Sequence, residues 1–184
     1  MAKWFFEPGH TAAEFCARHM MVSCVRGHFK NVHGTLDFDP DNPQATSVDV
    51  TIDAKGLWSG EPDRDTHLKS ADFLDVDKHP TITFKSTKIE PAGTDRYTLT
   101  GDLTIKGVTK PVTLNVVKYG EFNDPNMGHR IGYAAEGQIN RKDFGMSFDA
   151  MLDGKFIVSN EIKINIEGEL VEVPVAETAN VSSS

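Results

Sequence analysis

The feature that most constrains the fold of this chain is the alternation of apolar and polar side chains with a period of two. In residues 161–170, Ile162, Ile164 and Ile166 share one face, whereas most residues between them are polar. A β-strand with one buried face gives this pattern, because successive side chains point to opposite sides of the sheet. The same pattern predicts further strands at residues 4–6, 14–20, 27–38 with a break near Asn31, 47–53, 81–85, 97–106, 112–116 and 131–140.

Turn residues separate these segments; Gly107 to Pro111, for example, predict a hairpin. The exception is residues 60–80, which lack the period of two and are predicted to form a crossover with one or two short helices. There, Asp65 and Ser70 are predicted to cap helical turns, because their side-chain oxygens accept free amide hydrogens. Many one-faced strands and one helical crossover favour an all-β fold, either an antiparallel barrel or a sandwich, and the long connection favours a capped barrel.

Length and charge bound the domain organisation and the partners of the chain. With 184 residues it is about one domain long. We assign residues 1–172 to the barrel and residues 173–184, a small polar stretch, to a disordered tail. The net charge of −8 has the wrong sign for a nucleic-acid partner. No apolar run approaches the roughly 18 residues that a transmembrane helix needs.

The two cysteines, Cys16 and Cys24, are predicted to be inert thiols and not part of a disulfide scaffold. No zinc-ligand spacing accompanies them, and Cys16 is expected to face outward because it is out of phase with Phe15. The N-terminal segment lacks the apolar stretch of a secretory signal. We therefore expect a cytoplasmic location for the chain as written, and a periplasmic one if a leader has been removed.

The interior of a barrel of about eight strands is either filled by side chains or holds one narrow ligand. Residues predicted to point inward include small ones, Ala17, Ala135 and Gly137, and large ones such as Phe15 and Leu103. The small residues leave room for a ligand unless large residues across the barrel fill that room, and both alternatives are open at this point. A ligand in such a cavity would be mostly hydrocarbon, because each buried CH₂ contributes about 0.8 kcal/mol.

Several strings in the sequence resemble one known family in order and spacing. They are RDTHLKSADFLDVDKHP at 64–80, TITFKST at 81–87, GDLTIKGVTKPVTL at 101–114 and RKDFG at 141–145. With His10, His19 and Gly27-His28-Phe29, they resemble the YceI-like family of polyisoprenoid-binding, lipocalin-like proteins, from about Trp4 to Val171. The resemblance implies an extended antiparallel, lipocalin-like β-barrel with one short helical cap or crossover. It also implies an apolar tunnel for an isoprenoid quinone, a polyprenyl phosphate or a similar lipid, and a homodimer.

The tunnel and its polar mouth are assigned to separate sets of residues. The predicted tunnel-lining residues are Phe15, Ala17, His19, Val50, Ile52, Phe73, Phe84, Leu99, Leu103, Ile105, Leu114, Ala135 and Phe144. The predicted polar mouth comprises Arg64, Asp65, His67 and Arg141. Arginine suits a head group because its planar fork of donors matches a phosphate or a carbonyl. Structural alternatives exist: Arg64 and Asp65 pair within the protein or cap a turn, His19 is a hydrogen-bonded core residue, and Arg141 closes the other end of the barrel or is solvated at a strand end.

Two functions follow from these assignments. The first is a non-enzymatic carrier that holds one long isoprenoid as its ligand, with no other cofactor and no metal. The second is an enzyme acting on an amphiphilic isoprenoid, with Arg64, Asp65, His67 and His19 as an acid–base group near the mouth. We favour the carrier, because no nucleophile elbow, metal motif or dinucleotide-binding loop supports the enzyme.

Overall fold

The computed structural model describes residues 2–39, 42–152 and 154–174, which consist mostly of strands. The strands are β1 (Ala2–Phe6), β2 (Ala12–His19), β3 (Ser23–Phe29), β4 (Val32–Phe38), β5 (Ser47–Asp53), β6 (Thr81–Gly93), β7 (Arg96–Ile105), β8 (Val108–Asp124), β9 (Gly128–Asn140), β10 (Met151–Leu152), β11 (Lys155–Phe156) and β12 (Val158–Glu172). The helices are α1 (Pro62–Lys69) and the short 3-10 helices η1 (Pro8–His10), η2 (Pro43–Ala45), η3 (Ala54–Gly56) and η4 (Arg141–Phe144). No helix in the described ranges is long and apolar enough to cross a membrane. The predicted disordered tail lies outside the described residues from residue 175 onward.

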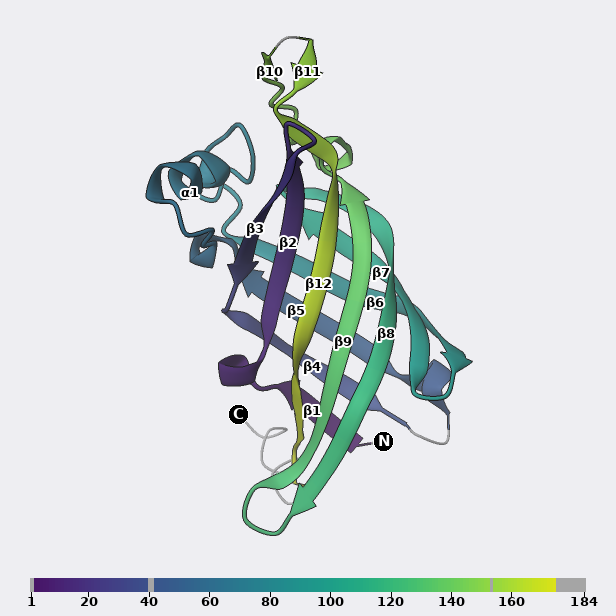
Figure 1. Ribbon diagram of the computed structural model, residues 1–184. Helices are drawn as coiled ribbons and strands as arrows, with labels where there is room; N and C mark the ends of the chain where they lie inside the picture. The colour runs from purple at the N-terminus through teal and green to yellow at the C-terminus, as the bar shows by residue number, and fades with distance from the viewer. Residues whose placement is uncertain (1, 40–41, 153, 175–184) are drawn as a thin grey trace.

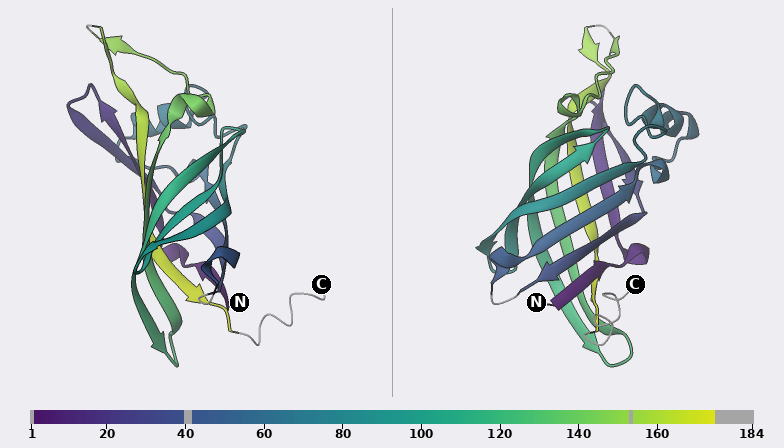
Figure 2. Two further views of the ribbon diagram at one scale, coloured as in Figure 1. Left: turned by 90° about the vertical axis from the view of Figure 1, so that its right-hand side faces the viewer. Right: turned by 180° about the vertical axis from the view of Figure 1, so that it is seen from behind.

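Antiparallel pairing joins the strands in the order β1-β4-β5-β6-β7-β8-β9-β12-β2-β3. A further pairing joins β12 to β1. It closes the part of the sheet that runs β1-β4-β5-β6-β7-β8-β9-β12 into a barrel (Figures 1 and 2). In Figure 1, β2, β12, β9 and β8 cross in front of β4, β5 and β6, and the two sets of strands enclose the interior between them. The β2–β3 hairpin continues the sheet along β12. The predicted antiparallel barrel is therefore confirmed.

Each predicted strand is present, and the break near Asn31 separates β3 from β4. The hairpin predicted at 107–111 is tighter than expected, because Pro111 lies within β8, opposite Asp102. Proline is tolerated at this position because β8 pairs with β9 only from Asn115 onward. At Pro111 the strand thus has no neighbour on its second side that would need an amide donor.

Helix α1 lies in the predicted crossover between β5 and β6, outside one end of the barrel (Figure 1). The predicted cap at Asp65 is wrong, because Glu61 occupies the N-cap position of α1. The prediction for Ser70 is confirmed, since its hydroxyl accepts the amide of Asp72 at 3.4 Å in the turn that follows the helix. Pro62 takes the first helical position, where its missing amide would have no intrahelical partner. Asp65 lies inside the helix, and its carboxylate accepts hydrogen bonds from the backbone and the hydroxyl of Ser59. This carboxylate ties the loop before α1 to the helix.

Cys16 in β2 and Cys24 in β3 form a disulfide, so the prediction of two free thiols is wrong. In the β2–β3 register Cys16 lies opposite Arg26 and Cys24 opposite Arg18, which makes the cysteines diagonal neighbours. Their Cα atoms are 5.9 Å apart, within the usual range for a disulfide. The bond joins the two strands near the tip of their hairpin.

His129 reinforces the closure of the barrel. Its Nδ1 and Nε2 lie 2.7 and 2.6 Å from the carboxylates of Glu172 and Glu121, and Trp4 of β1 packs against its ring edge to face. Burial lowers the pKa of His129, but the hydrogen bonds to the two glutamates outweigh burial, and the net shift is upward. Hydrogen bonds from Lys118 and His129 lower the pKa of Glu121. Strands β8, β9 and β12 therefore share one ionic network beside Trp4.

We expect His129→Gln to flatten the dependence of stability on pH near neutrality. Because its pKa is raised, charged His129 stabilises the fold fully below its ordinary value of 6.5, and this contribution is lost as pH rises through the raised value. Between about pH 6 and pH 8, the free energy of unfolding should fall by up to about 1 kcal/mol more in the wild type than in the variant. Urea denaturation measures both slopes, and equal slopes would contradict this role of His129.

The lowered pKa of Glu121 acts at the acid end of the same network. Its contribution is present above its ordinary value of 4.5 and is lost as pH falls through the lowered value. The pair of His129 and Glu121 is therefore complete between these two ordinary values, where the histidine is charged and Glu121 is ionised.

Candidate ligand cavity

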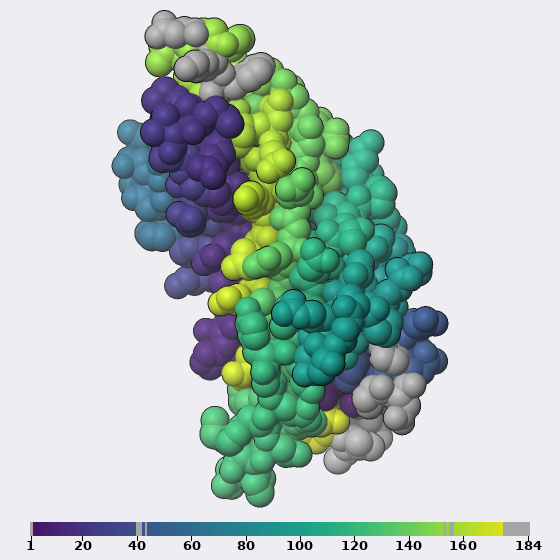
Figure 3. All heavy atoms as spheres, turned by 45° about the vertical axis from the view of Figure 1, so that its right-hand side comes forward, coloured from purple at the N-terminus to yellow at the C-terminus, as the bar shows by residue number. Residues whose placement is uncertain are grey.

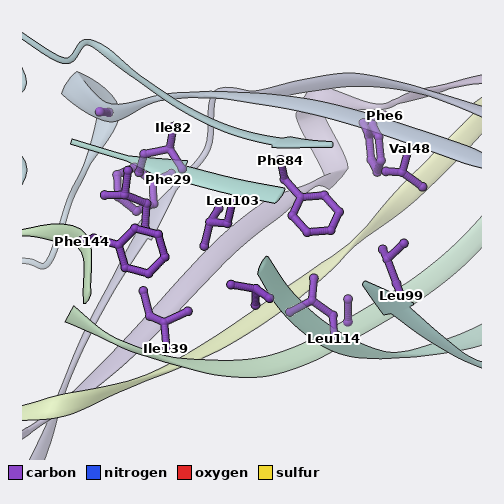
Figure 4. Close-up of a cluster of buried hydrophobic side chains, with 14 of the residues drawn as sticks. Phe6, Phe29, Val48, Ile82, Phe84, Leu99, Leu103, Leu114, Ile139 and Phe144 are labelled. Atoms are coloured by element: carbon purple, nitrogen blue, oxygen red, sulfur yellow. The ribbon is translucent and has the colours of Figure 1, made fainter. Parts of the chain in front are cut away.

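An elongated apolar cavity runs inside the barrel, from the cap (residues 54–80) to the end where β1 meets β12. Its volume is about 310 Å³, at the lower end of the roughly 300–1,000 Å³ typical of ligand pockets. Phe73 of the cap borders it at one end and Leu170 of β12 at the other. Figure 4 shows side chains from different strands, including Phe84 and Leu114, pointing toward this interior. The wall is therefore made by the inward faces of the alternating strands.

The interior is partly filled by side chains and partly open, so each of the two alternatives describes part of it. Some small positions are covered by large neighbours: a Cβ on Gly137 would lie 2.5 Å from Leu114, and one on Gly101 would lie 2.4 Å from the ring of Phe84. At Gly101 the added Cβ would also lie 2.6 Å from the backbone carbonyl of Lys85, so a side chain is excluded there, whereas at Gly137 the end of the Leu114 side chain would have to shift. Ala135, in contrast, borders the cavity. Space therefore remains along the axis although part of the interior is filled.

Most residues predicted to line a tunnel border this cavity. They are Phe15, Ala17, Val50, Ile52, Phe73, Phe84, Leu99, Leu103, Ile105, Leu114 and Ala135. His19 and Phe144 do not border it, which corrects their placement. His19 is the last residue of β2, and Ala17 is the last residue of this strand that borders the cavity. Phe144 is buried in η4 and packs into the core beside the cavity. Contact of these residues with a ligand stays a prediction.

The sequence assignment left out several residues of the wall. Ile162, Ile164 and Ile166 of β12 all border the cavity, as do Phe6 of β1 and Leu36 of β4. The three isoleucines form the clearest alternation in the chain. The period of two could have identified them, because the face of a strand that carries the apolar residues is the face that meets the interior.

Two of the residues predicted for a polar mouth stabilise the cap and do not border the cavity. Arg64 donates from Nε to the hydroxyl of Ser59 at 2.8 Å and from Nη2 to the carbonyl of the same residue at 2.7 Å. Asp65 accepts from the backbone amide of Ser59 at 2.9 Å. Arg64 and Asp65 therefore pair within the protein, as the structural alternative stated, because their polar groups fix the loop before α1.

His67, the third predicted mouth residue, closes the cap through an aromatic cluster. Its ring centre lies 5.1 Å from that of Phe73 and 4.8 Å from that of Phe148, both edge-on, and its Nε2 lies 2.8 Å from Asp72. Phe73 borders the cavity, and the guanidinium of Arg141 lies 6.0 Å from the centre of its ring. His67 is thus separated from the cavity by one ring.

Arg141 is the predicted mouth residue that borders the cavity, and it is only 1% exposed. It donates from Nε to the carbonyl of Ser159 at 3.0 Å, from Nη1 to the carbonyl of Met146 at 2.7 Å and from Nη2 to Asp149 at 3.1 Å. A guanidinium has five N–H groups, so these bonds leave two for a further acceptor. Hydrogen bonds from Lys142 and Arg141 hold the pKa of Asp149 below its usual range.

Tyr133 borders the cavity, and its hydroxyl is buried beside Thr11. Its ring meets Phe6 of β1 edge to face, with 5.7 Å between the ring centres. Burial raises the pKa of Tyr133 well above its usual value, and the hydroxyl of Thr11 lowers it only slightly. The phenol is therefore neutral at physiological pH and adds polarity without charge.

The residues of the enzyme alternative do not form one acid–base group. Arg64 and Asp65 are engaged with Ser59, whereas His67 faces the aromatic cluster and His19 lies at the end of β2. Within the part of the chain that the structure describes, no three or more histidine, cysteine, aspartate or glutamate side chains are placed to hold a metal ion. The chemistry that this site offers is burial of hydrocarbon beside one buried guanidinium.

These features define an antiparallel β-barrel, capped by a short helix, that encloses an elongated apolar cavity. Residues 4–170 match the family model of the YceI-like domain. The chain therefore belongs to the YceI-like family, and the resemblance seen in the sequence is confirmed.

Relatives and solved structures agree with this assignment. Protein YceI of Salmonella newport (strain SL254) is 41% identical over 162 residues, covering 88% of this chain and 83% of that relative. A Campylobacter jejuni YCEI protein of known crystal structure is 32% identical, with a TM-score of 0.72 over 85% of this chain and 90% of that chain. A polyisoprenoid binding domain from Saccharophagus degradans shares the fold at 12% identity, with a TM-score of 0.66 over 95% of this chain and 99% of that chain.

Proposed function

We propose that this protein is a non-enzymatic carrier that holds one long isoprenoid, an isoprenoid quinone or a polyprenyl phosphate, in the barrel cavity. The observation that carries the proposal is the elongated cavity of about 310 Å³ with apolar walls. The polyisoprenoid binding domain from Saccharophagus degradans, which has the same fold, supports an isoprenoid as the ligand class.

Burial of the tail supplies enough free energy for useful affinity. Each CH₂ that enters contributes about 0.8 kcal/mol, so about fifteen carbons contribute roughly 12 kcal/mol. Association costs at least about 4 kcal/mol. The remainder of about 8 kcal/mol corresponds to micromolar binding. The tail therefore sets the affinity, and polar groups set the orientation.

The polar head of the ligand would lie at the cap end, beside Arg141. The two N–H groups left by its bonds to Ser159, Met146 and Asp149 suit a quinone carbonyl or a phosphate oxygen. The hydroxyl of Tyr133, elsewhere in the wall, is itself buried and offers no second contact for the head. The guanidinium of Arg141 therefore favours the cap end of the cavity as the position of a charged or strongly polar head group.

The fate of a defined isoprenoid tests the carrier function. Protein stripped of lipid is incubated with an isoprenoid quinone or a polyprenyl phosphate of known tail length, repurified and extracted into organic solvent. We expect one ligand per chain, recovered with its mass unchanged. A changed mass would favour an enzyme that acts on an amphiphilic isoprenoid, and no uptake of either compound would contradict the carrier function.

We also propose that the protein works in an oxidising compartment. The disulfide between Cys16 and Cys24 supports this, because cytosolic thiols are kept reduced. Of the two locations expected from the sequence, the disulfide favours the periplasm over the cytoplasm. The homodimer implied by the resemblance is likewise a proposal, which native mass spectrometry tests through the mass of the assembly.

A further inference from the structure

We propose that the cap end of the barrel docks on an anionic lipid bilayer through two neighbouring apolar hairpin tips. The tip residues are Met20, Met21 and Val22 between β2 and β3, and Met151 and Leu152 in β10. These five residues are named the cap-end tips. The inference rests on the proposed carrier function, because it adds the surface at which the lipid enters.

Backbone hydrogen bonds hold the two tips side by side. The amide of Met20 donates to the carbonyl of Ile157 at 2.8 Å, and the amide of Ile157 donates to the carbonyl of Ala150, which precedes Met151, at 2.9 Å. Both hairpins lie at the same end of the barrel in all the ribbon views (Figures 1 and 2). The tips can therefore contact one surface together.

The cap-end tips expose large apolar side chains. The exposed fractions are 69% for Met21, 81% for Val22, 58% for Met151 and 56% for Leu152. Contiguous apolar side chains on a protein surface mark a contact with a partner or a membrane. Met20 and Met21 also adopt positive φ values of 48° and 60°, a region uncommon for methionine. Such backbone strain is concentrated at functional segments.

The cap-end tips adjoin the wall of the cavity. Val158 borders the cavity, and its partner in the β2–β12 register is His19, the residue before Met20. Arg141, the buried cation in the wall, donates to the carbonyl of Ser159, next to Val158. A lipid that leaves a bilayer at the tips therefore meets the cavity close to the group proposed for its head.

The charge around the tips favours an anionic bilayer as the partner. Although the whole chain has a net charge of −8, no aspartate or glutamate occurs between Glu14 and Asp37. Within this stretch, Arg18 and Arg26 are exposed and lie opposite the two disulfide cysteines. The neighbouring β12 adds an exposed carboxylate, Glu161. Cations beside exposed apolar side chains are the pattern of a protein surface that binds anionic lipids.

The opposite end of the barrel provides a matched surface of different charge. The β8–β9 hairpin exposes Tyr119, Phe122 and Met127 to a similar degree, but Glu121 and Asp124 lie among them. Figure 3 shows this hairpin projecting at the end opposite the β2–β3 tip. Its basic side chains, Lys118, His129 and Arg130, are paired with glutamates, so the hairpin offers anionic lipids no unpaired cation and serves as the control for apolar exposure alone.

Cosedimentation with lipid vesicles tests the docking surface. The vesicles contain equal parts of phosphatidylglycerol and phosphatidylcholine, or phosphatidylcholine alone. We expect the wild type to bind the anionic vesicles, and the double variant Met21→Ser/Val22→Ser to bind them at least about tenfold more weakly. The matched control, Tyr119→Ser/Phe122→Ser, should bind as the wild type does.

A charge variant and two independent measurements separate docking from folding and from carrier function. Arg18→Gln/Arg26→Gln should weaken binding to the anionic vesicles only, and added salt should weaken wild-type binding in the same way. Thermal unfolding reports whether each variant is folded. Native mass spectrometry reports its bound lipid, and all three variants should hold the same lipid as the wild type once loaded.

Binding of Met21→Ser/Val22→Ser equal to that of the wild type would overturn the proposal, as would a wild type that binds neither kind of vesicle. If the protein still holds an isoprenoid in either case, the carrier function stands and only the docking surface is lost. Dimerisation that depends on concentration and disappears in Met21→Ser/Val22→Ser would also overturn it, because the tips would then cover a second copy of the chain.

Discussion

Replacing Ala135 with tryptophan should remove the ligand from the cavity and leave the protein folded. Ala135 is buried in β9 and borders the cavity, and its register partners are Val116 and Ile166. An indole at this position occupies space that the tail of the ligand would fill. Displacing about five carbons costs roughly 4 kcal/mol, which weakens binding on the order of a thousandfold.

The control for this change lies one residue along the same strand. Glu136 points to the outer face, so Glu136→Trp adds the same indole without entering the barrel. Leu103→Trp, in β7, provides a second blocking variant. Mass spectrometry of the extracted lipid and thermal unfolding are measured for all three. Lipid retained at wild-type levels in both folded lumen variants would contradict a ligand in this cavity.

Arg141→Met should destabilise the protein by about 3 kcal/mol or more, because its loss leaves two carbonyls without their side-chain donor and removes one of the two cations that pair with a carboxylate. For a chain of this length, the melting temperature should fall by about 6–12 °C. The carbonyls belong to Ser159 and Met146, and the carboxylate to Asp149. Differential scanning calorimetry of protein stripped of lipid measures the loss without a contribution from ligand.

Lys142→Met is the matched control, since Lys142 hydrogen-bonds the same carboxylate of Asp149 from a more exposed position. Its melting temperature should stay close to that of the wild type, because exposed ion pairs contribute little. If the two variants lost equal stability, the buried guanidinium would not be the anchor of this region. A normal melting temperature with weaker binding in Arg141→Met would instead assign Arg141 to the ligand alone.

The fold was predictable because the period of two is a direct consequence of strand geometry. Each apolar residue in phase, from Val50 in β5 to Ile162 in β12, lies on the inward face. The same argument identified most of the cavity wall. It failed at His19, the last residue of β2, because the cavity borders this strand only as far as Ala17. Period alone therefore predicts which face of a strand points inward, but not how far along the strand the cavity extends.

The disulfide could not be predicted because the turn between its strands has no turn signal in the sequence. Met20 and Met21 occupy the left-handed region, which glycine or asparagine usually takes in tight hairpins. If the hairpin is not recognised, nothing in the sequence places Cys16 beside Cys24. In the structure, the two cysteines lie at similar distances from the turn between β2 and β3. The pairing is a property of the β2–β3 register and not of the cysteine spacing.

The polar site was predicted less well because the cap has no periodic pattern from which side-chain directions follow. Arg64 and Asp65 were assigned to the cavity mouth, but both side chains form hydrogen bonds with Ser59 in the loop before α1. Arg141 follows a strand that is in phase with the core, so its approach to the cavity could be inferred from β9. Short-range hydrogen bonds in loops are decided by geometry that the sequence pattern does not contain.

Native mass spectrometry of the protein purified without detergent tests the central claim most directly. The carrier account predicts a folded protein whose mass exceeds that of the chain by one isoprenoid per chain, and organic extraction should release this lipid unchanged. A folded protein that carries no lipid, and that takes up none when isoprenoid quinones and polyprenyl phosphates are added, would contradict the account.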